Sequence, residues 1–238
     1  MLRIKKGNPY YVLPSQRYDL TTLPPSEIMQ KDFTFFVKFN MFDVIENQTT
    51  PSSIMMRPGM HYGLTYNQNT GNISWEYWYE FENEDKFEFV TLKTEPYSLT
   101  DEWIVIIQHN LDEKTFKMSL ISKDNTSIEI EKTYSGRLCN YAETPYNFGC
   151  GNYFEQVEES HYFWGDYNLH YSGLIKNCKV NEDDILKFVS DNTNSKFKLN
   201  NYIDDLVFYF NFNEQNKYKV WDLSGHCNFL MKNMDIGK

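Results

Sequence analysis

The chain has 238 residues, a formal net charge of −10 and an aromatic content of 17%. This length suits one large all-β domain or two small ones, and it is enough to bury a core without disulfide or metal staples. Basic residues form no cluster beyond the short run at 3–6, and no stretch reaches the ~18 consecutive apolar residues of a membrane span, so neither nucleic-acid binding nor membrane insertion is expected.

Short apolar segments with a period of two recur along the chain and predict strands. The aromatic residues that alternate through 33–40 would share one core face, because successive side chains of a strand point to opposite sides. The segments 61–66 and 73–82, joined by the turn 67–71, predict a hairpin. The segment 102–109 is apolar on both faces for part of its length, which indicates a central strand. The other predicted strands are 10–13, 53–57, 87–91, 115–122, 127–133 and 206–213.

The segment 73–82 has the clearest pattern in the chain. Its odd positions, from Ile73 to Phe81, are all apolar and predict a core face. Its even positions are mainly acidic, and Trp78 stands among them. A tryptophan in this setting is either half covered as part of a second buried layer or exposed as a platform for a flat, hydroxyl-rich ligand. The acidic positions are Glu76, Glu80 and Glu82.

One helix is predicted, near 181–189. Asn181 is suited to cap its N-terminus, acidic residues occupy the first turn, and apolar residues follow. Many short strands with one late helix predict an all-β, two-sheet antiparallel β-sandwich. No segment is long enough to act as a linker, so we expect a single domain over 1–238, with 1–9 as an N-terminal arm and 206–238 as closing strands.

Four passages, taken in order, resemble the concanavalin A-like lectin/glucanase superfamily in its laminin G-like form, and together they span 10–235. The passages are Asp32-Phe-Thr-Phe-Phe-Val-Lys-Phe39; the Trp-led strand 102–110 with the hairpin strand 116–121; Tyr146-Asn-Phe-Gly-Cys-Gly151 with 171–180 and 183–185; and 206–214 with 220–228. The turn Asp222-Leu-Ser-Gly225 often opens such a module and here closes the chain. It would supply the last strands of the same sandwich, or it is the stub of a second repeat.

The resemblance implies a jelly-roll fold, a glycan partner and no required cofactor. Laminin G-like domains often hold a Ca²⁺ ion at the rim of the sandwich through Asp side chains and backbone carbonyls. The metal ligands stay unknown here, with Asp166 and Asp222 as the candidates by position.

Glycoside hydrolysis is the third functional hypothesis. Carboxylates two residues apart on a strand face lie about 7 Å apart, within the range that hydrolyses glycosides. Glucanases of this superfamily carry Glu-x-Asp-x-x-Glu or a similar run, whereas Trp78 occupies the middle acid position between Glu76 and Glu80, and the assisting Asp is missing. There is also no nucleophile elbow and no phosphate-binding loop. We therefore expect no catalytic residues.

Two regions are candidates for carbohydrate binding. On the strand face, Trp78 would stack on a pyranose ring while Glu76 and Glu80 accept hydrogen bonds from its hydroxyls. The second region comprises the loop 149–154 and the stretch 161–170, which is predicted to be irregular, and its aromatic, amide and acidic side chains also suit saccharides. Its alternative role is to close one end of the sandwich, and His161 and His170 are metal ligands by residue type only. The binding candidates there are Asn152, Tyr153, Trp164, Asp166 and Asn168.

The leading hypothesis is a non-catalytic, lectin-like carbohydrate-binding module. The alternative is a structural, decoration or adhesion protein of a virus or phage particle, whose partners would be other virion or assembly proteins. The N-terminus carries charge without a following apolar segment, so we expect no signal peptide, cytoplasmic synthesis and, for the alternative, a place on the virion surface.

The four cysteines, at positions 139, 150, 178 and 227, form no C-x-x-C pair. They are expected to be free thiols in a reducing compartment, while a Cys139–Cys150 bridge stays open for a protein that ends up outside the cell.

Overall fold

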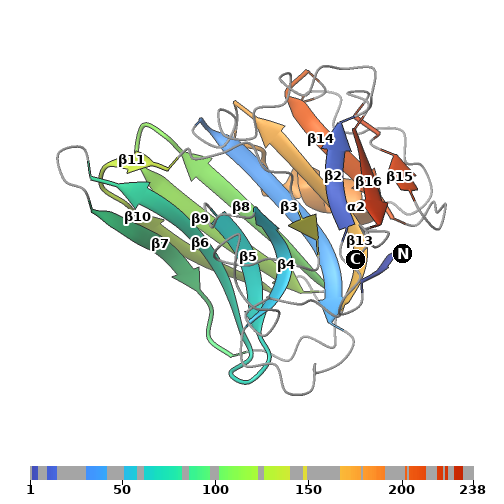
Figure 1. The fold of residues 1–238 in the computed structure, drawn as a ribbon, viewed down its shortest axis with the longest axis horizontal. Coiled ribbons are helices and arrows are strands. Elements are labelled where there is room, and N and C mark those ends of the chain that lie inside the picture. The colour runs from blue at the N-terminus through green and yellow to red at the C-terminus, as the bar shows by residue number, and fades with distance from the viewer. Residues whose placement is uncertain are drawn as a thin grey trace, which may run out of the picture.

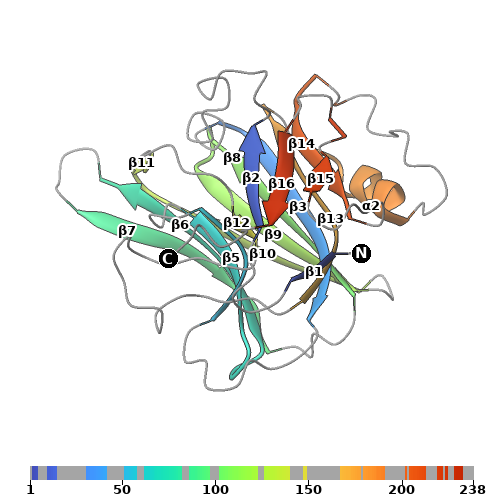
Figure 2. The ribbon, with the colours of Figure 1, turned by 45° about the vertical axis from the view of Figure 1, so that its right-hand side comes forward.

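The described strands of the chain form two antiparallel sheets (Figure 1, Figure 2). The computed structural model describes residues 2–4, 10–14, 31–41, 51–57, 62–81, 86–96, 102–122, 126–139, 147–148, 167–177, 179–190, 202, 204–212, 219–221, 223–224 and 228–232. The predicted all-β sandwich is confirmed. Within these ranges no helix combines the length and apolarity needed to cross a membrane.

The first sheet has seven strands, in the order β1-β13-β3-β8-β9-β10, and β14 also pairs with β13. Strand β8 lies between β3 and β9, as its apolar sequence predicted. The bounds are β1 (Leu2–Ile4), β3 (Phe33–Met41), β8 (Trp103–Asn110), β9 (Thr115–Ser122), β10 (Ser127–Thr133), β13 (Tyr167–Lys176) and β14 (Leu206–Asn211).

The second sheet has nine strands, in the order β11-β6-β5-β4-β12-β2-β16-β15, and β7 also pairs with β6. The predicted hairpin of β5 and β6 is confirmed. The bounds are β2 (Tyr10–Pro14), β4 (Ser52–Arg57), β5 (Tyr62–Asn67), β6 (Asn72–Glu80), β7 (Phe87–Lys93), β11 (Arg137–Leu138), β12 (Asn147–Phe148), β15 (Lys219–Trp221) and β16 (Asn228–Lys232).

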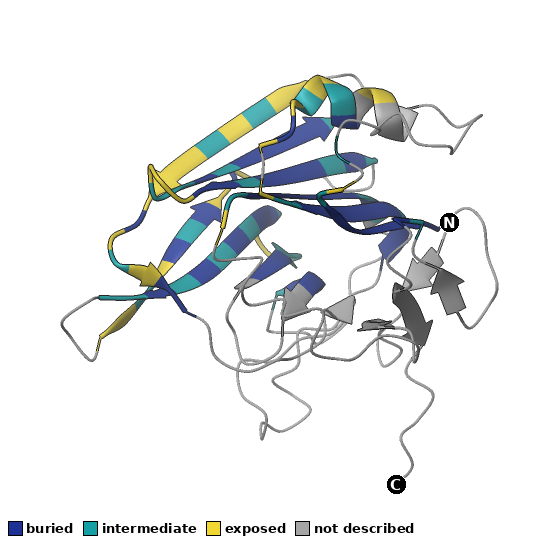
Figure 3. Cartoon of the chain, turned by 90° about the horizontal axis from the view of Figure 1, so that it is seen from above, coloured by how far each residue is buried: buried dark blue, intermediate teal, exposed yellow. Residues whose placement is uncertain are grey.

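The main core lies between the two sheets, where buried residues of both face one another (Figure 3). It is rich in aromatic side chains. Trp75 and Tyr77 of β6 are fully buried, as the apolar face of their strand predicted. The ring of Trp75 stacks on Phe35 with centroids 6.3 Å apart, and Tyr77 stacks on Phe116 at 5.4 Å. Aromatic pairs of this kind add about 0.5–1.5 kcal/mol beyond the burial of their area. One face of β6 is therefore fixed toward the core, and its other face must point outward.

A second apolar cluster covers the outer face of the seven-stranded sheet, where the helix α2 (Glu182–Ser190) packs. Its members are Phe36, Ile106, Ile121, Tyr171, Ile175, Val180, Ile185, Leu206 and Tyr209. The predicted N-cap is confirmed, because the backbone N–H of Asp183 donates to Oδ1 of Asn181 at 2.9 Å. Strand β8 is thus covered on both faces.

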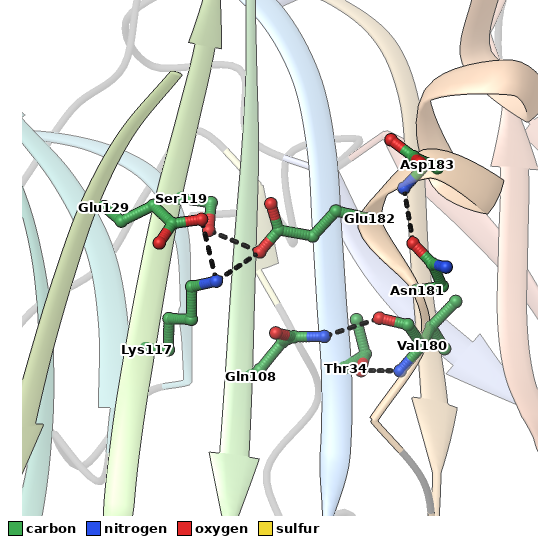
Figure 4. Close-up of polar contacts among 9 residues, drawn as sticks. All are labelled: Thr34, Gln108, Lys117, Ser119, Glu129, Val180, Asn181, Glu182 and Asp183. Carbon is green, nitrogen blue, oxygen red and sulfur yellow. Dashed lines mark hydrogen bonds and ion pairs between the residues drawn. The ribbon is translucent and has the colours of Figure 1, made fainter.

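Polar contacts fix the start of α2 on this sheet (Figure 4). The backbone N–H of Val180 donates to Thr34 Oγ1 at 3.1 Å, and its carbonyl accepts a hydrogen bond from Gln108 Nε2 at 2.6 Å. Lys117 Nζ lies 3.0 Å from a carboxylate oxygen of Glu182 and 2.8 Å from one of Glu129. Side chains of β3 and β8 therefore bind Val180 just before the helix, and Lys117 of β9 binds Glu182 in its first turn, so this part of the outer face is covered by the protein itself.

Gly173 of β13 allows the ring of Phe36 to lie directly over the backbone of its partner strand. A Cβ added at Gly173 would overlap Cζ of Phe36 and come within 2.6 Å of Cε1. Because the Phe36 ring is itself fully buried, we expect Gly173→Ala to lower the free energy of unfolding by about 1–3 kcal/mol, measured by urea denaturation. A Gly173→Ala, Phe36→Leu double variant should lose less than the two single changes added together. Additive losses would contradict this contact.

Candidate functional site

The outer face of the nine-stranded sheet carries the acidic side of β6. Ser74, Glu76, Trp78 and Glu80 are partly exposed there, while the alternate residues face the core. The register places Thr91 of β7 beside Glu76. On the opposite side of Glu76, β5 contributes only a glycine at position 63. The prediction that β6 has one buried apolar face and one outer face with acidic residues is therefore confirmed.

Trp78 does not stand alone, because two phenylalanines of β7 lie beside it. Its ring meets Phe89 edge to face, with centroids 4.8 Å apart and an interplanar angle of 87°, and it lies 6.3 Å from Phe87. Phe87 is 47% exposed and Phe89 is 43% exposed, which is rare for side chains of this size in the described structure. We call Trp78, Phe87 and Phe89 the aromatic platform.

Sequence reasoning missed both phenylalanines. The strand 87–91 was predicted, and Phe87 and Phe89 share one of its faces by the period of two. Which face points outward depends on the register with β6, where Phe89 pairs with Trp78 and Phe87 with Glu80. From the hydrophobic pattern alone, two phenylalanines on one face of a strand would be assigned to the core. Only the register of β7 with β6 shows that they lie on the outer face beside Trp78.

The indole nitrogen of Trp78 takes no part in polar contacts. Its Nε1 atom is buried, and no hydrogen-bond partner for it lies among the described residues. A donor in that position is not offered to a ligand, so the contribution of Trp78 to any binding would come from its ring. The sequence left two roles open for Trp78, a half-covered position in a second buried layer or an exposed platform for a ligand. The structure combines them, because the nitrogen is buried while the side chain as a whole is partly exposed.

Glu80 is bound by an arginine of the neighbouring strand. The Nε atom of Arg137 donates to Glu80 Oε1 at 2.8 Å, and its Nη2 atom contacts the same oxygen. The pair exists because β11 joins β6 at this point, with Arg137 opposite Glu80. Two charge-assisted contacts to one oxygen neutralise the carboxylate. Glu80 therefore borders the platform as half of an ion pair.

Glu76 is different, because within the described part of the chain its carboxylate has no hydrogen-bond or ion-pair partner. Burial raises the pKa of Glu76, and the positive charge of Lys93 partly opposes this effect. A half-buried carboxylate without a partner is poorly solvated and gains from any donor that reaches it. Glu76 is thus the polar group on this face that is most available to a ligand.

The spacing of the two glutamates does not suit glycoside hydrolysis. Glu76 and Glu80 are four residues apart along β6 and so about 13 Å apart along the strand, beyond the roughly 5–9.5 Å that separates catalytic carboxyl pairs. Trp78 fills the position between them.

The second predicted region is only partly described. Asn152, Tyr153, Trp164, Asp166 and His161 lie outside the described residues, as does Asp222, so their predicted roles remain predictions. The expectation of an irregular segment at 167–168 was wrong, because β13 begins at Tyr167 and pairs there with β1 and β3. Asn168 is a strand residue with 6% exposure.

His170 belongs to a small polar cluster on the outer face of the seven-stranded sheet. Its Nε2 atom lies 2.9 Å from Asn40 Oδ1 and 3.9 Å from a carboxylate oxygen of Glu102, which is paired with Lys38 at 2.9 Å. Among the described residues no three His, Cys, Asp or Glu side chains gather as a metal ion would need. Cys139 is a buried free thiol whose pKa is raised to about 12 by burial, and the other three cysteines lie outside the described ranges.

The described strands define an all-β sandwich of two antiparallel sheets. No family model matches the sequence, and no curated protein matches it. A candidate carbohydrate-binding protein from Bacteroides ovatus aligns over 98% of this chain with a TM-score of 0.56 and 10% identity. The chain spans 59% of the length of that protein. At this identity the likeness concerns the fold alone.

Two further solved structures align at lower scores. The CBM40 module of a Ruminococcus gnavus sialidase, bound to α2,3 sialyllactose, aligns over 71% of this chain and 90% of its own with a TM-score of 0.47 and 12% identity. The LG1-3 region of the laminin α2 chain aligns over 71% of this chain and 30% of its own, with a TM-score of 0.44 and 10% identity.

Proposed function

We propose that the protein is a non-catalytic carbohydrate-binding module and that a glycan binds on the outer face of β6 and β7. The observation that carries the proposal is the aromatic platform beside Glu76, whose carboxylate has no hydrogen-bond or ion-pair partner among the described residues. Pyranose rings present C–H faces that pack on aromatic rings and hydroxyls that donate to carboxylates. The partly exposed ring of Trp78 and the Glu76 carboxylate supply both contacts from one rigid strand.

The rigidity of this face supports binding without induced fit. The inward side of β6 is fixed by Trp75 and Tyr77 in the core, and its edges are paired with β5, β7 and β11. Side chains held by strands lose little conformational freedom when a ligand arrives, which favours affinity from a small contact area.

Three variants test the proposal by isothermal titration, with a ligand chosen from a broad glycan array. We expect Trp78→Ala to weaken binding about 30-fold, since a central aromatic residue contributes roughly 2 kcal/mol. Trp78→Phe should keep most of the affinity, because the indole N–H is buried and the ring carries the contact.

Leu111→Ala is the matched control, since Leu111 is 42% exposed but lies in the turn between β8 and β9. It should bind like the parent protein. Each variant is compared by thermal unfolding, so that loss of fold is separated from loss of binding. Absence of binding across the whole array, or equal affinity of Trp78→Ala and the parent, would refute the proposed function.

Protein–protein contact is the second candidate, and the exposure of Phe87 and Phe89 favours it. Exposed aromatic residues on an edge strand suit a partner surface as well as a sugar. An assembly or decoration role would bury both rings. A Phe87→Ser, Phe89→Ser double variant that keeps glycan affinity but loses co-purifying partner chains would support this candidate over the first.

A further inference from the structure

We infer that the site selects glycans carrying a protonated amino group, and that it discriminates against N-acetylated and acidic sugars. This inference rests on the proposed function and specifies its ligand. It comes from the charges around the aromatic platform and from which of those charges are already paired.

Two of the positive charges near the platform, those of Arg137 and Lys86, are engaged in ion pairs. Arg137 is held by Glu80, and Lys86 lies 2.7 Å from a carboxylate oxygen of Glu88 and 4.9 Å from the ring centre of Phe81. The hydroxyl of Tyr79 also donates to Glu88 at 2.9 Å. Within the described residues, each carboxylate beside the platform other than Glu76 therefore has a cationic partner.

Among the described residues, Glu76 is the carboxylate beside the platform that has no ion-pair partner. It lies on the same strand face as Trp78, two residues away, with Thr91 on one side and Gly63 on the other. Gly63 offers no side chain to neutralise it. Lys93 faces Ser74, one pair further along, and acts on Glu76 at a distance rather than through an ion pair. The most available group in the site is thus a poorly solvated negative charge.

A sugar ammonium group would satisfy this carboxylate better than a hydroxyl. Hydrogen bonds between an ammonium and a carboxylate are charge-assisted and stronger than those of neutral donors. The neighbouring rings add to the preference, because a cation over the face of Trp78 is attracted by its π electrons. A ligand carboxylate would instead face Glu76, while Arg137 and Lys86 are already paired and Lys93 lies one register pair further along.

The whole molecule reinforces the local preference. Its net charge of −10 repels anionic glycans at a distance and attracts cationic ones. This long-range effect is not specific to the site, so the experiment must separate it from the contribution of Glu76.

Chitotriose and its fully deacetylated form are a matched pair of probes, because they share ring stereochemistry and differ in the charge on nitrogen. Titrations at about pH 6.5 should show the deacetylated trisaccharide binding about tenfold more tightly, as expected for one charge-assisted hydrogen bond. Glu76→Gln, which keeps the shape and removes the charge, should abolish that difference.

Glu131→Gln is the control for net charge. Glu131 is exposed on β10 of the other sheet, so its loss changes the long-range field equally and leaves the site intact. This variant should keep the tenfold preference. A preference that vanishes equally in both variants would overturn the assignment to Glu76.

The outcomes distinguish the inference from the proposed function. Equal binding of the two trisaccharides, or Trp78-dependent binding of sialyllactose at similar affinity, would overturn the charge selectivity while leaving a glycan-binding site. Failure of both trisaccharides and of every other saccharide on the array would overturn the proposed function, and the inference with it.

Discussion

Replacing Gly136 with alanine is expected to lower the free energy of unfolding by about 3 kcal/mol or more. Gly136 has a φ of +100°, a conformation that residues with a Cβ rarely adopt. A Cβ at this position would also overlap the backbone oxygen of Glu80 and lie 3.3 Å from Cα of Phe81. The overlap is with backbone, which cannot rotate away as a side chain can.

The effect should extend to the candidate site. Gly136 immediately precedes β11, whose pairing with β6 places Arg137 on Glu80. Forcing the two backbones apart would break this ion pair and leave Glu80 free to compete with Glu76 for a cation. We therefore expect Gly136→Ala to reduce the discrimination between charged and N-acetylated sugars as well as the stability.

Urea denaturation measures the stability, and Gly71→Ala is the comparison. Gly71 has a φ of 73° in the turn between β5 and β6, so its substitution reports the cost of a positive φ, about 1–2 kcal/mol. Similar losses in the two variants would show that the close approach at Glu80 does not matter.

The sandwich itself was predictable because the alternation of apolar and polar residues is visible within the sequence of each strand. The alternation in 33–40 and 73–82, the doubly apolar 102–109 and the capped helix at 181 all have local causes, and all four predictions were confirmed. Local sequence patterns do not predict a strand whose position is fixed mainly by hydrogen bonding to its partner strands. The segment 167–168 was predicted to be irregular because its polar residues interrupt the apolar pattern. It is nevertheless part of β13, which is fixed by pairing with β1 and β3.

The candidate site was half predictable for the same reason. The sequence of β6 alone identifies Trp78 and its acidic neighbours as an anomaly. It does not predict that Phe89 and Phe87 lie next to Trp78, that Arg137 forms an ion pair with Glu80, or that Gly63 lies opposite Glu76. Each of these facts is a cross-strand register, and register between segments far apart in sequence is a property of the folded sheet.

His109 is expected to make the fold less stable in mild acid. The side chain is fully buried between Phe33 and Phe116, and its ring stacks on Phe116 with centroids 4.6 Å apart. Its Nδ1 atom lies 2.6 Å from the backbone carbonyl of Lys31, and its Nε2 atom lies 2.8 Å from the hydroxyl of Tyr134. A carbonyl can only accept, so we assign the proton to Nδ1, and Nε2 then accepts from Tyr134.

This arrangement satisfies the neutral imidazole completely. Burial lowers the pKa of His109, although the hydrogen bond to Lys31 and the charge of Asp32 act the other way. Burial also raises the pKa of Tyr134 to about 12, which keeps its hydroxyl a donor. The unfolded chain has a histidine of ordinary pKa, near 6.5, and so it binds a proton more readily than the folded chain.

Protonation of His109 should destabilise the fold only below about pH 6.5. Above about pH 6.5 both states are neutral at His109 and the effect is absent, whereas below that value protonation favours the unfolded state. Stability should fall by up to about 1.4 kcal/mol per pH unit until the pH reaches the lower pKa of the folded state. Urea denaturation at several pH values between 7.5 and 5.5 measures this slope.

His109→Asn should remove much of the slope while lowering stability at pH 7.5 by roughly 2 kcal/mol, because asparagine can still donate to Lys31 but leaves the Tyr134 hydroxyl without its acceptor. His170→Asn is the matched control. Burial lowers the pKa of His170 as well, but the side chain is 12% exposed and the charge of Glu102 opposes the shift, so its share of the slope should be smaller. If His109→Asn kept the parent slope and His170→Asn lost it, the acid sensitivity would belong to the outer face of the seven-stranded sheet and not to the core.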